Sequence, residues 1–215
     1  MLHLAQCNIA IGVKMGAIDT INPAVTWRER KRLETFRRIT DVAMDLFLTQ
    51  GFEETTLDTI AEAAAISKRT FFYYFSGKEE VLAAWQQGLP EEFKQALIME
   101  TPNGSPLDLV YRVQLRLMKG RDTGHARAVN RIIRENENLS ASNQVKFLRL
   151  EQAVFEALIE LWPDIVRRDE LRTVAMVAIG ALRLALDKWA SAQGEKPLAD
   201  FLDREIAQLK RITPR

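Results

Sequence analysis

Apolar residues recur at helical spacing along this chain, and no segment gives a convincing strand pattern. The clearest stripe has the spacing i, i+3, i+4, i+7, i+8 and consists of Ile39, Val42, Ala43, Leu46 and Phe47. That spacing places all five side chains on one face of an amphipathic helix. The helix is predicted over about residues 27–50, and Gly51 is a natural stop for it. The pattern predicts an all-α protein.

Two short helices are predicted next, followed by a break at Ser76 and Gly77 and a fourth helix from about Lys78. Thr55 or Thr56 can cap the first of the two, and Ser67 can cap the second. The inner face of the first short helix consists of Leu57, Ile60, Ala61 and Ala64. Two short helices joined by a tight turn have the spacing of a helix-turn-helix, whose second helix lies in the major groove of DNA.

The second short helix carries the residue types that read DNA. Lys68 and Arg69 stand in its first turn, where arginine can bond guanine bidentately and lysine can reach the same acceptors or a phosphate. The hydroxyl of Thr70 can meet a phosphate, and Tyr73 and Tyr74 can pack on sugar or base edges. Phe71 and Phe75 are four residues apart, and we expect this pair to anchor the helix to its domain.

Turn-forming residues at 101–106 indicate a loop, and further helices are predicted beyond it. They lie at about residues 107–120, 125–136, 141–161, 168–192 and 197–211. Between residues 174 and 186 the 168–192 helix is apolar on nearly every face, so it must be buried on two sides. One side can be the core of its own domain and the other a partner chain. A central helix within a monomer is the alternative.

The charge of the chain is local rather than general. The formal net charge is only +1, so any contact with a nucleic acid must come from a patch. Residues 28–38 provide one, with six lysines and arginines against Glu29 and Glu34. A solvated helix face is the other interpretation of this run. Lys78 adds a cation at the start of the fourth helix, where its ammonium group and the helix N-terminus could both contact a phosphate.

Catalytic and metal-binding arrangements are not suggested by the sequence. Cys7 is the single cysteine, which excludes an internal disulfide and fits a reducing cytoplasm. The expected location is therefore cytoplasmic, and nucleoid-associated for a protein that binds DNA. His3 and His125 are far apart and lack further ligands at metal-binding spacing. No nucleophile stands beside a base, and the apolar run at 174–182 is too short to span a bilayer. We therefore expect no enzyme activity, no cofactor, no metal and no membrane contact.

Residues 1–26 precede the first predicted helix. The apolar positions in this segment are not preceded by basic residues, so a signal peptide fits poorly. Three interpretations stay open: a disordered leader, a start codon placed too early with Met15 as the real start, and a functional arm.

One stretch resembles a known family. Residues 56–82, TLDTIAEAAAISKRTFFYYFSGKEEVL, are similar to the DNA-binding motif of the TetR family of transcriptional regulators. The preceding AMDLF and the turn at Gly51 and Phe52 extend the resemblance to about residues 32–82. By position, the DNA contacts that it implies fall on Thr56, Lys68, Arg69, Thr70, Tyr73, Tyr74 and Lys78.

The resemblance also implies an organisation and a function. It implies an N-terminal DNA-binding head at residues 27–87, with its motif at 56–75, and a C-terminal helical domain at 88–215. That domain would bind a small-molecule effector and form a homodimer through residues 168–192 and 197–211. The expected function is a ligand-responsive repressor of a palindromic operator in double-stranded DNA. The alternatives are an interaction protein that has lost DNA binding and a small helical enzyme using the C-terminal cavity.

Two positions depart from the family pattern. Ala65 stands where the family usually has glycine in the turn, and a left-handed conformation there would cost about 1 kcal/mol. Phe72 stands where many members have a tyrosine that bonds phosphate. One hydroxyl contact is therefore missing, and Tyr73 or Tyr74 can compensate for it.

Overall fold

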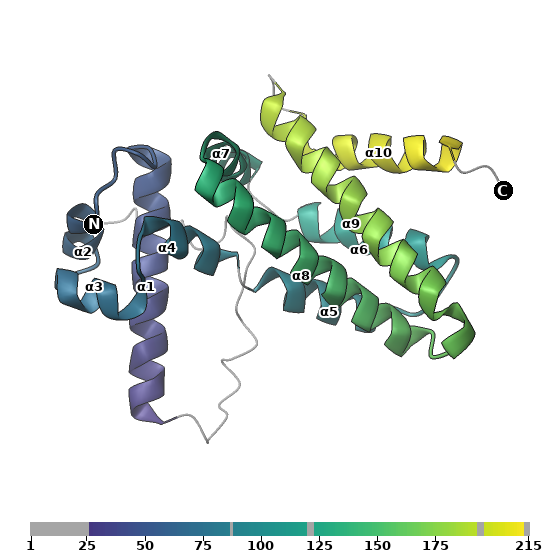
Figure 1. Cartoon of the computed structure of the whole chain (residues 1–215), viewed down its shortest axis with the longest axis horizontal. Helices are drawn as coiled ribbons and strands as arrows, with labels where there is room; N and C mark the ends of the chain where they lie inside the picture. Colours follow the sequence, from purple (N-terminus) through teal and green to yellow (C-terminus); the bar gives the residue numbers. More distant parts are fainter. Residues whose placement is uncertain (1–25, 87, 120–122, 193–195, 213–215) are drawn as a thin grey trace.

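The computed structural model describes residues 26–86, 88–119, 123–192 and 196–212, and every regular element in these ranges is helical. The elements are α1 (Trp27–Thr49), α2 (Leu57–Ala63), α3 (Lys68–Tyr74), α4 (Lys78–Trp85), α5 (Leu89–Ile98), α6 (Pro106–Lys119), α7 (Thr123–Glu135), α8 (Glu137–Leu161), the 3₁₀ turn η2 (Ile165–Arg167), α9 (Arg168–Ser191) and α10 (Leu198–Ile212). The all-α prediction is confirmed. Figure 1 shows α1–α4 at one end of the molecule and α5–α10 extending away from them.

Helix α1 forms where the sequence pattern places it. Thr26 caps its first turn, because the Thr26 hydroxyl accepts from the backbone N–H of Glu29 while the Glu29 carboxylate accepts from the backbone N–H of Thr26. The predicted stripe faces inward, with Ile39 and Phe47 fully buried. Gly51 ends the helix at a φ of 94°, the left-handed conformation that glycine adopts without strain. Residues 1–25 of the expected leader, with Met15, lie outside the described residues, and Thr26 is the N-cap of α1.

The segment from Lys78 forms two helices, α4 and α5, whereas the sequence pattern gave only the start of a helix near Lys78. The break comes after Trp85, and α5 starts again at Leu89 with Pro90 in its first turn. Proline lacks the N–H that a continuous helix would need, whereas the first turn of a new helix tolerates it. The break lies at the predicted boundary between the head and the C-terminal domain.

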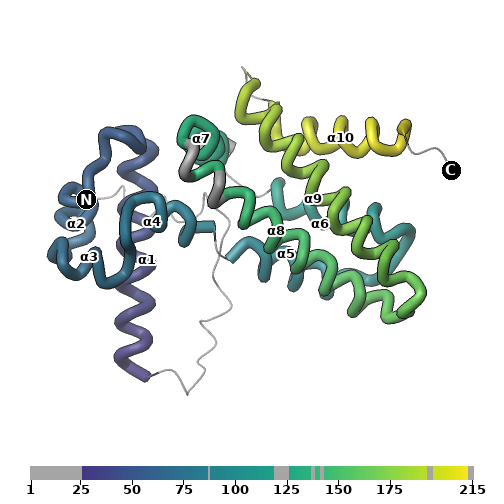
Figure 2. Tube along the Cα trace, viewed as in Figure 1, coloured from purple at the N-terminus to yellow at the C-terminus, as the bar shows by residue number. Residues whose placement is uncertain are grey.

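The C-terminal helices pack around α9. Its small and apolar residues Ala175, Ala178, Leu182 and Ala185 are buried in a core shared with α5, α6, α8 and α10. The tube in Figure 2 shows α8 and α9 running side by side over most of their length. In the ranges that the structure describes, no helix combines the length and apolarity needed to cross a membrane.

The core of the head includes residues that come after residue 87 in the sequence. Val129 and Ile133 of α7 and Leu139 of α8 are buried in the same cluster as Val81 and Leu82 of α4. Removing these apolar surfaces from water joins the head to the C-terminal helices. Helix α4 is therefore packed on both parts of the molecule.

Candidate DNA-binding interface

Two side-chain caps define the short helices of the motif. The Thr56 hydroxyl accepts from the backbone N–H of Thr59 at 3.1 Å and caps α2. The Ser67 hydroxyl accepts from the backbone N–H of Thr70 at 3.0 Å and caps α3. Both predicted caps are confirmed. Thr55 is buried instead, and its hydroxyl donates to the Gly51 carbonyl at 2.7 Å.

The turn between α2 and α3 requires a left-handed residue, and that residue is Ala65. Its φ is 51°, so the sequence departure from glycine carries the expected strain. Two backbone bonds hold the turn: the Ala65 N–H donates to the Glu62 carbonyl, and the Ile66 N–H donates to the Ala61 carbonyl, each at 2.9 Å. The turn keeps its geometry despite the side chain at residue 65.

Helix α3 is held by two buried aromatic residues. Phe71 and Phe75 are almost fully buried, and their ring centroids lie 5.8 Å apart. Phe75 also contacts Phe36 of α1 at a centroid distance of 4.9 Å. The expectation that this pair anchors the helix is confirmed. The opposite side of α3 is thereby presented to solvent in a fixed orientation.

The solvent side of α3 carries Arg69 and Tyr73. Arg69 is exposed and has no hydrogen-bond or ion-pair partner among the described residues. Tyr73 is 72% exposed, and its ring meets that of Tyr74 edge-on at 5.1 Å. Tyr74 is partly buried against the head core. Arg69 and Tyr73 are therefore available to a ligand, whereas Tyr74 mainly supports its neighbour.

Lys68 is exposed but bridged to α2. Its Nζ lies 2.9 Å from a carboxylate oxygen of Asp58, and both side chains are more than half exposed. An ion pair so open to water contributes little stability and can exchange its carboxylate for a phosphate. The hydroxyls of Thr56 and Thr70 take part in the helix caps, where each is hydrogen bonded within its own turn.

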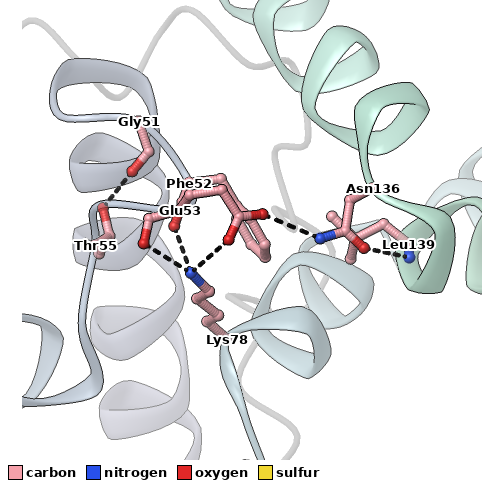
Figure 3. A network of polar contacts seen from close by, with 7 residues as sticks. All are labelled: Gly51, Phe52, Glu53, Thr55, Lys78, Asn136 and Leu139. Carbon is pink, nitrogen blue, oxygen red and sulfur yellow. Dashed lines mark hydrogen bonds and ion pairs between the residues drawn. The ribbon is translucent and has the colours of Figure 1, made fainter.

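Lys78 has an environment that sequence reasoning did not foresee (Figure 3). Its Nζ donates to the Phe52 carbonyl at 2.7 Å and to the Glu53 carbonyl at 3.2 Å, and lies 4.5 Å from the centroid of the Phe52 ring. The side chain is only 18% exposed. Such an ammonium fixes the loop between α1 and α2 to the start of α4. This geometry favours a positioning role for Lys78 over the phosphate contact that the resemblance implies.

The same network reaches the C-terminal helices. One carboxylate oxygen of Glu53 lies 3.6 Å from Lys78 Nζ, and the other accepts from the Asn136 amide at 3.2 Å. Asn136 in turn caps α8, because its side-chain oxygen accepts from the Leu139 N–H. An asparagine just before a helix is a cap signal that the sequence shows. The contact of Asn136 with Glu53 joins residues 83 positions apart, so no local sequence pattern predicts it.

The basic run of α1 is largely exposed. Arg28, Arg30, Arg32 and Arg38 face solvent, and Lys31 pairs with Glu34 at 3.0 Å. Figure 1 shows α2 and α3 beside α1 at the outer end of the head, away from α5–α10. Among the described residues, no other part of the chain thus covers the cations of α3. This end of the molecule has the charge that attracts a polyanion.

Comparison with known proteins also indicates a helix-turn-helix DNA-binding domain in this part of the chain. Residues 39–85 match the family model of bacterial regulatory proteins, tetR family. The HTH-type transcriptional regulator TcmR of Streptomyces glaucescens is 40% identical over 80 residues, which cover 37% of this chain and 35% of TcmR. The chain thus spans about a third of the length of this curated relative.

Solved structures extend the likeness to the whole fold. The TetR-family repressor FadR of Thermus thermophilus, in complex with lauroyl-CoA, has a TM-score of 0.58 at 24% identity and covers 84% of this chain and 96% of its own. A candidate TetR-family regulator from Mesorhizobium loti has a TM-score of 0.59 at 15% identity, with the same coverage. The head is a helix-turn-helix domain of the TetR type. The sequence of this domain is thus similar to the TetR family of transcriptional regulators, and the fold of the chain is similar to that of the solved structures.

Proposed function

We propose that the protein is a DNA-binding transcription regulator that inserts α3 into the major groove. The observation that carries this proposal is the exposed face of α3, where Arg69 has no partner in the described part of the chain and Lys68 has only a solvent-exposed one. The named relatives are regulators rather than enzymes, which supports the same class. DNA contacts are assigned to Arg69, Lys68 and Tyr73, with Thr56, Thr70 and Tyr74 beside them.

A homodimer is the proposed active form, with α9 and α10 as its interface. An apolar groove of about 260 Å³ runs between these helices and is lined by residues including Val177, Gly180 and Leu184. Leu184 and Met176 are more than half exposed, although they lie in the stretch of α9 that is apolar on nearly every face. A second copy would cover this face and set two heads side by side. Two recognition helices related by a twofold axis would bind a palindromic operator.

A small molecule is proposed to control DNA binding from the C-terminal side. The Thermus relative was solved with lauroyl-CoA, which supports ligand binding by this fold. Control requires that the effector binds the DNA-released arrangement of the heads better than the DNA-bound one. Helix α4 is packed on both parts of the molecule and is the element through which such a preference would be transmitted.

The test is a gel shift with duplexes selected from a randomised pool by the full-length protein. Replacing Lys68 and Arg69 together by alanine is expected to weaken binding strongly and to remove sequence preference. The matched control replaces Arg167 and Arg168 by alanine, which removes the same charge at the far end of the molecule. Equal affinity of the two double variants would exclude α3 as the recognition helix.

A further inference from the structure

Phe72 is an exposed aromatic residue on the proposed DNA-binding side of α3. Its side chain is 50% exposed, and that of the adjacent Tyr73 is 72% exposed. Among the described residues 26–86, Trp27 is the only other large apolar side chain that is exposed. Single exposed apolar residues are ordinary on a protein surface, whereas two adjacent ones on one short helix indicate a contact surface.

The ring of Phe72 lies next to the two cations of α3. Lys68 precedes it by four residues and Arg69 by three, and residues at these spacings are neighbours on a helix surface. The ring also meets the ring of the buried Phe71 edge-on, with centroids 5.9 Å apart and an interplanar angle of 87°. A duplex that contacts Lys68 and Arg69 therefore also meets Phe72, whose ring is supported from the inside of the head.

The chemistry of phenylalanine restricts what Phe72 can contact in DNA. Its ring has no hydrogen-bond donor or acceptor comparable to a hydroxyl, so it cannot bond a phosphate as a tyrosine would. It cannot bond the nitrogen and oxygen atoms of the base edges either. The major groove presents one apolar group, the C5-methyl of thymine, and phenylalanine is among the side chains that contact this group.

We propose that Phe72 recognises a thymine by packing against its C5-methyl group, and so determines one base of the DNA site. This inference rests on the proposed function, because it requires α3 to lie in the major groove. Thr70 carries a methyl group on the same helix, but it is only partly exposed, and its hydroxyl lies 2.8 Å from the Ser67 hydroxyl in the helix cap. Phe72 offers the larger and more accessible apolar surface.

The experiment replaces thymine by uracil, which removes the C5-methyl group and keeps the hydrogen-bonding atoms of the base edge. The full-length protein is bound to a duplex that it has selected from a randomised pool, and each thymine is replaced singly by deoxyuridine. Replacement of the thymine that Phe72 contacts should lower affinity about fourfold, the usual effect of one buried apolar carbon. A selected site without thymine would overturn the proposal, as would unchanged affinity at every replaced thymine.

Variants test whether the methyl group is contacted by this ring. Phe72→Gln should bind the thymine and uracil duplexes equally, whereas Phe72→Leu, which stays apolar, should keep most of the fourfold preference. Each preference compares two duplexes with the same variant, so a change in the amount of folded protein cancels. A fourfold preference that persists in Phe72→Gln would overturn the assignment.

Two controls separate Phe72 from its neighbours. Thr70→Ser loses the methyl group of Thr70 but keeps the hydroxyl of the cap, and Tyr73→Ala removes the other exposed ring of α3. Both variants should keep the fourfold preference for thymine, whatever their affinity for the duplex. Loss of the preference in either control would assign the methyl contact to that residue instead of Phe72.

Failure of this contact and failure of the proposed function give different results. If binding depends on Lys68 and Arg69 but is indifferent to every uracil replacement, α3 remains the recognition helix and the role of Phe72 falls. If the protein selects no duplex from the pool, both fall together. The predicted outcome is one uracil-sensitive position, at which Phe72→Gln no longer selects thymine from the pool.

Discussion

Replacing Lys78 by methionine tests whether this residue positions the head or contacts DNA. Methionine keeps the apolar stem and the approximate length of the lysine side chain but removes the ammonium. The Phe52 and Glu53 carbonyls would each lose a charged donor, at 2.7 and 3.2 Å, and the Phe52 ring would lose its cation. The ion pair with the Glu53 carboxylate is exposed on the Glu53 side and contributes little.

The expected loss is about 2 kcal/mol in the free energy of unfolding of the head. This magnitude follows because one of the two bonds is partly buried, and a buried acceptor that loses a charged donor costs about 1–3 kcal/mol. Urea denaturation followed by circular dichroism measures it. The control is Lys68→Met, whose exposed bridge to Asp58 should change stability by no more than about 0.5 kcal/mol.

The same two variants separate the roles in DNA binding. A lysine that contacts a phosphate lowers the slope of log affinity against log salt by about one when it is removed. We expect Lys68→Met to show this loss and Lys78→Met to keep the wild-type slope. A Lys78→Met variant of unchanged stability with a slope reduced by about one would refute the positioning role and make Lys78 a phosphate contact.

Three further predictions concern the turn, the contact between Ser76 and Glu80 at the start of α4, and the dimer. Ala65→Gly should raise the free energy of unfolding by about 0.5 kcal/mol, because relief of the left-handed strain exceeds the greater entropy of glycine in the unfolded chain; a lower thermal midpoint would contradict this. Hydrogen bonds from the Ser76 backbone N–H and hydroxyl lower the pKa of Glu80, so its ionised form stabilises the folded head at neutral pH and the effect fades as pH falls through that lowered pKa. Glu80→Gln should therefore unfold at a lower temperature than wild type at neutral pH, and the difference should shrink as pH falls through the lowered pKa of Glu80; a difference that stays constant with falling pH would count against this cause. Leu184→Glu should give a monomer by light scattering, whereas Val166→Glu, at a more exposed apolar site outside the groove, should not; a dimer in both would exclude the α9–α10 interface.

The sequence was sufficient to predict those helices and caps that depend on interactions between residues close together in the chain. The stripe through Ile39 and Phe47 predicts α1 because side-chain spacing and helix period act within a few turns. Thr56 and Ser67 predict the starts of α2 and α3 because a cap bonds its own first turn. The buried role of Phe71 likewise follows from its position relative to residues on the same helix.

The sequence was insufficient to predict contacts between residues that are far apart in the chain. Lys78 has the position of a phosphate contact in the family motif, and only the fold shows that residues 25 and 26 positions earlier accept its hydrogen bonds. Val129 and Ile133 fit the pattern of any C-terminal helix, yet they complete the core of the head. The break before α5 had a local signal in Pro90, which the apolar pattern alone did not use.

A cavity beside α4 depends on contacts between three helices. Asn143, Lys146 and Arg149 look like an ordinary polar stretch of α8 in the sequence. Only the packing of α4 and α7 against that stretch makes these residues line a cavity and buries the Asn143 oxygen without a partner in the described part of the chain.

Methylation protection of guanine N7 tests the central claim most directly, because this atom lies in the major groove where α3 is proposed to bind. On a duplex selected by the full-length protein, we predict two clusters of protected guanines, centred one helical turn or a whole number of turns apart, as expected for two recognition helices. Arg69→Ala should lose protection in both clusters. Uniform guanine reactivity with the protein fully bound would contradict the account.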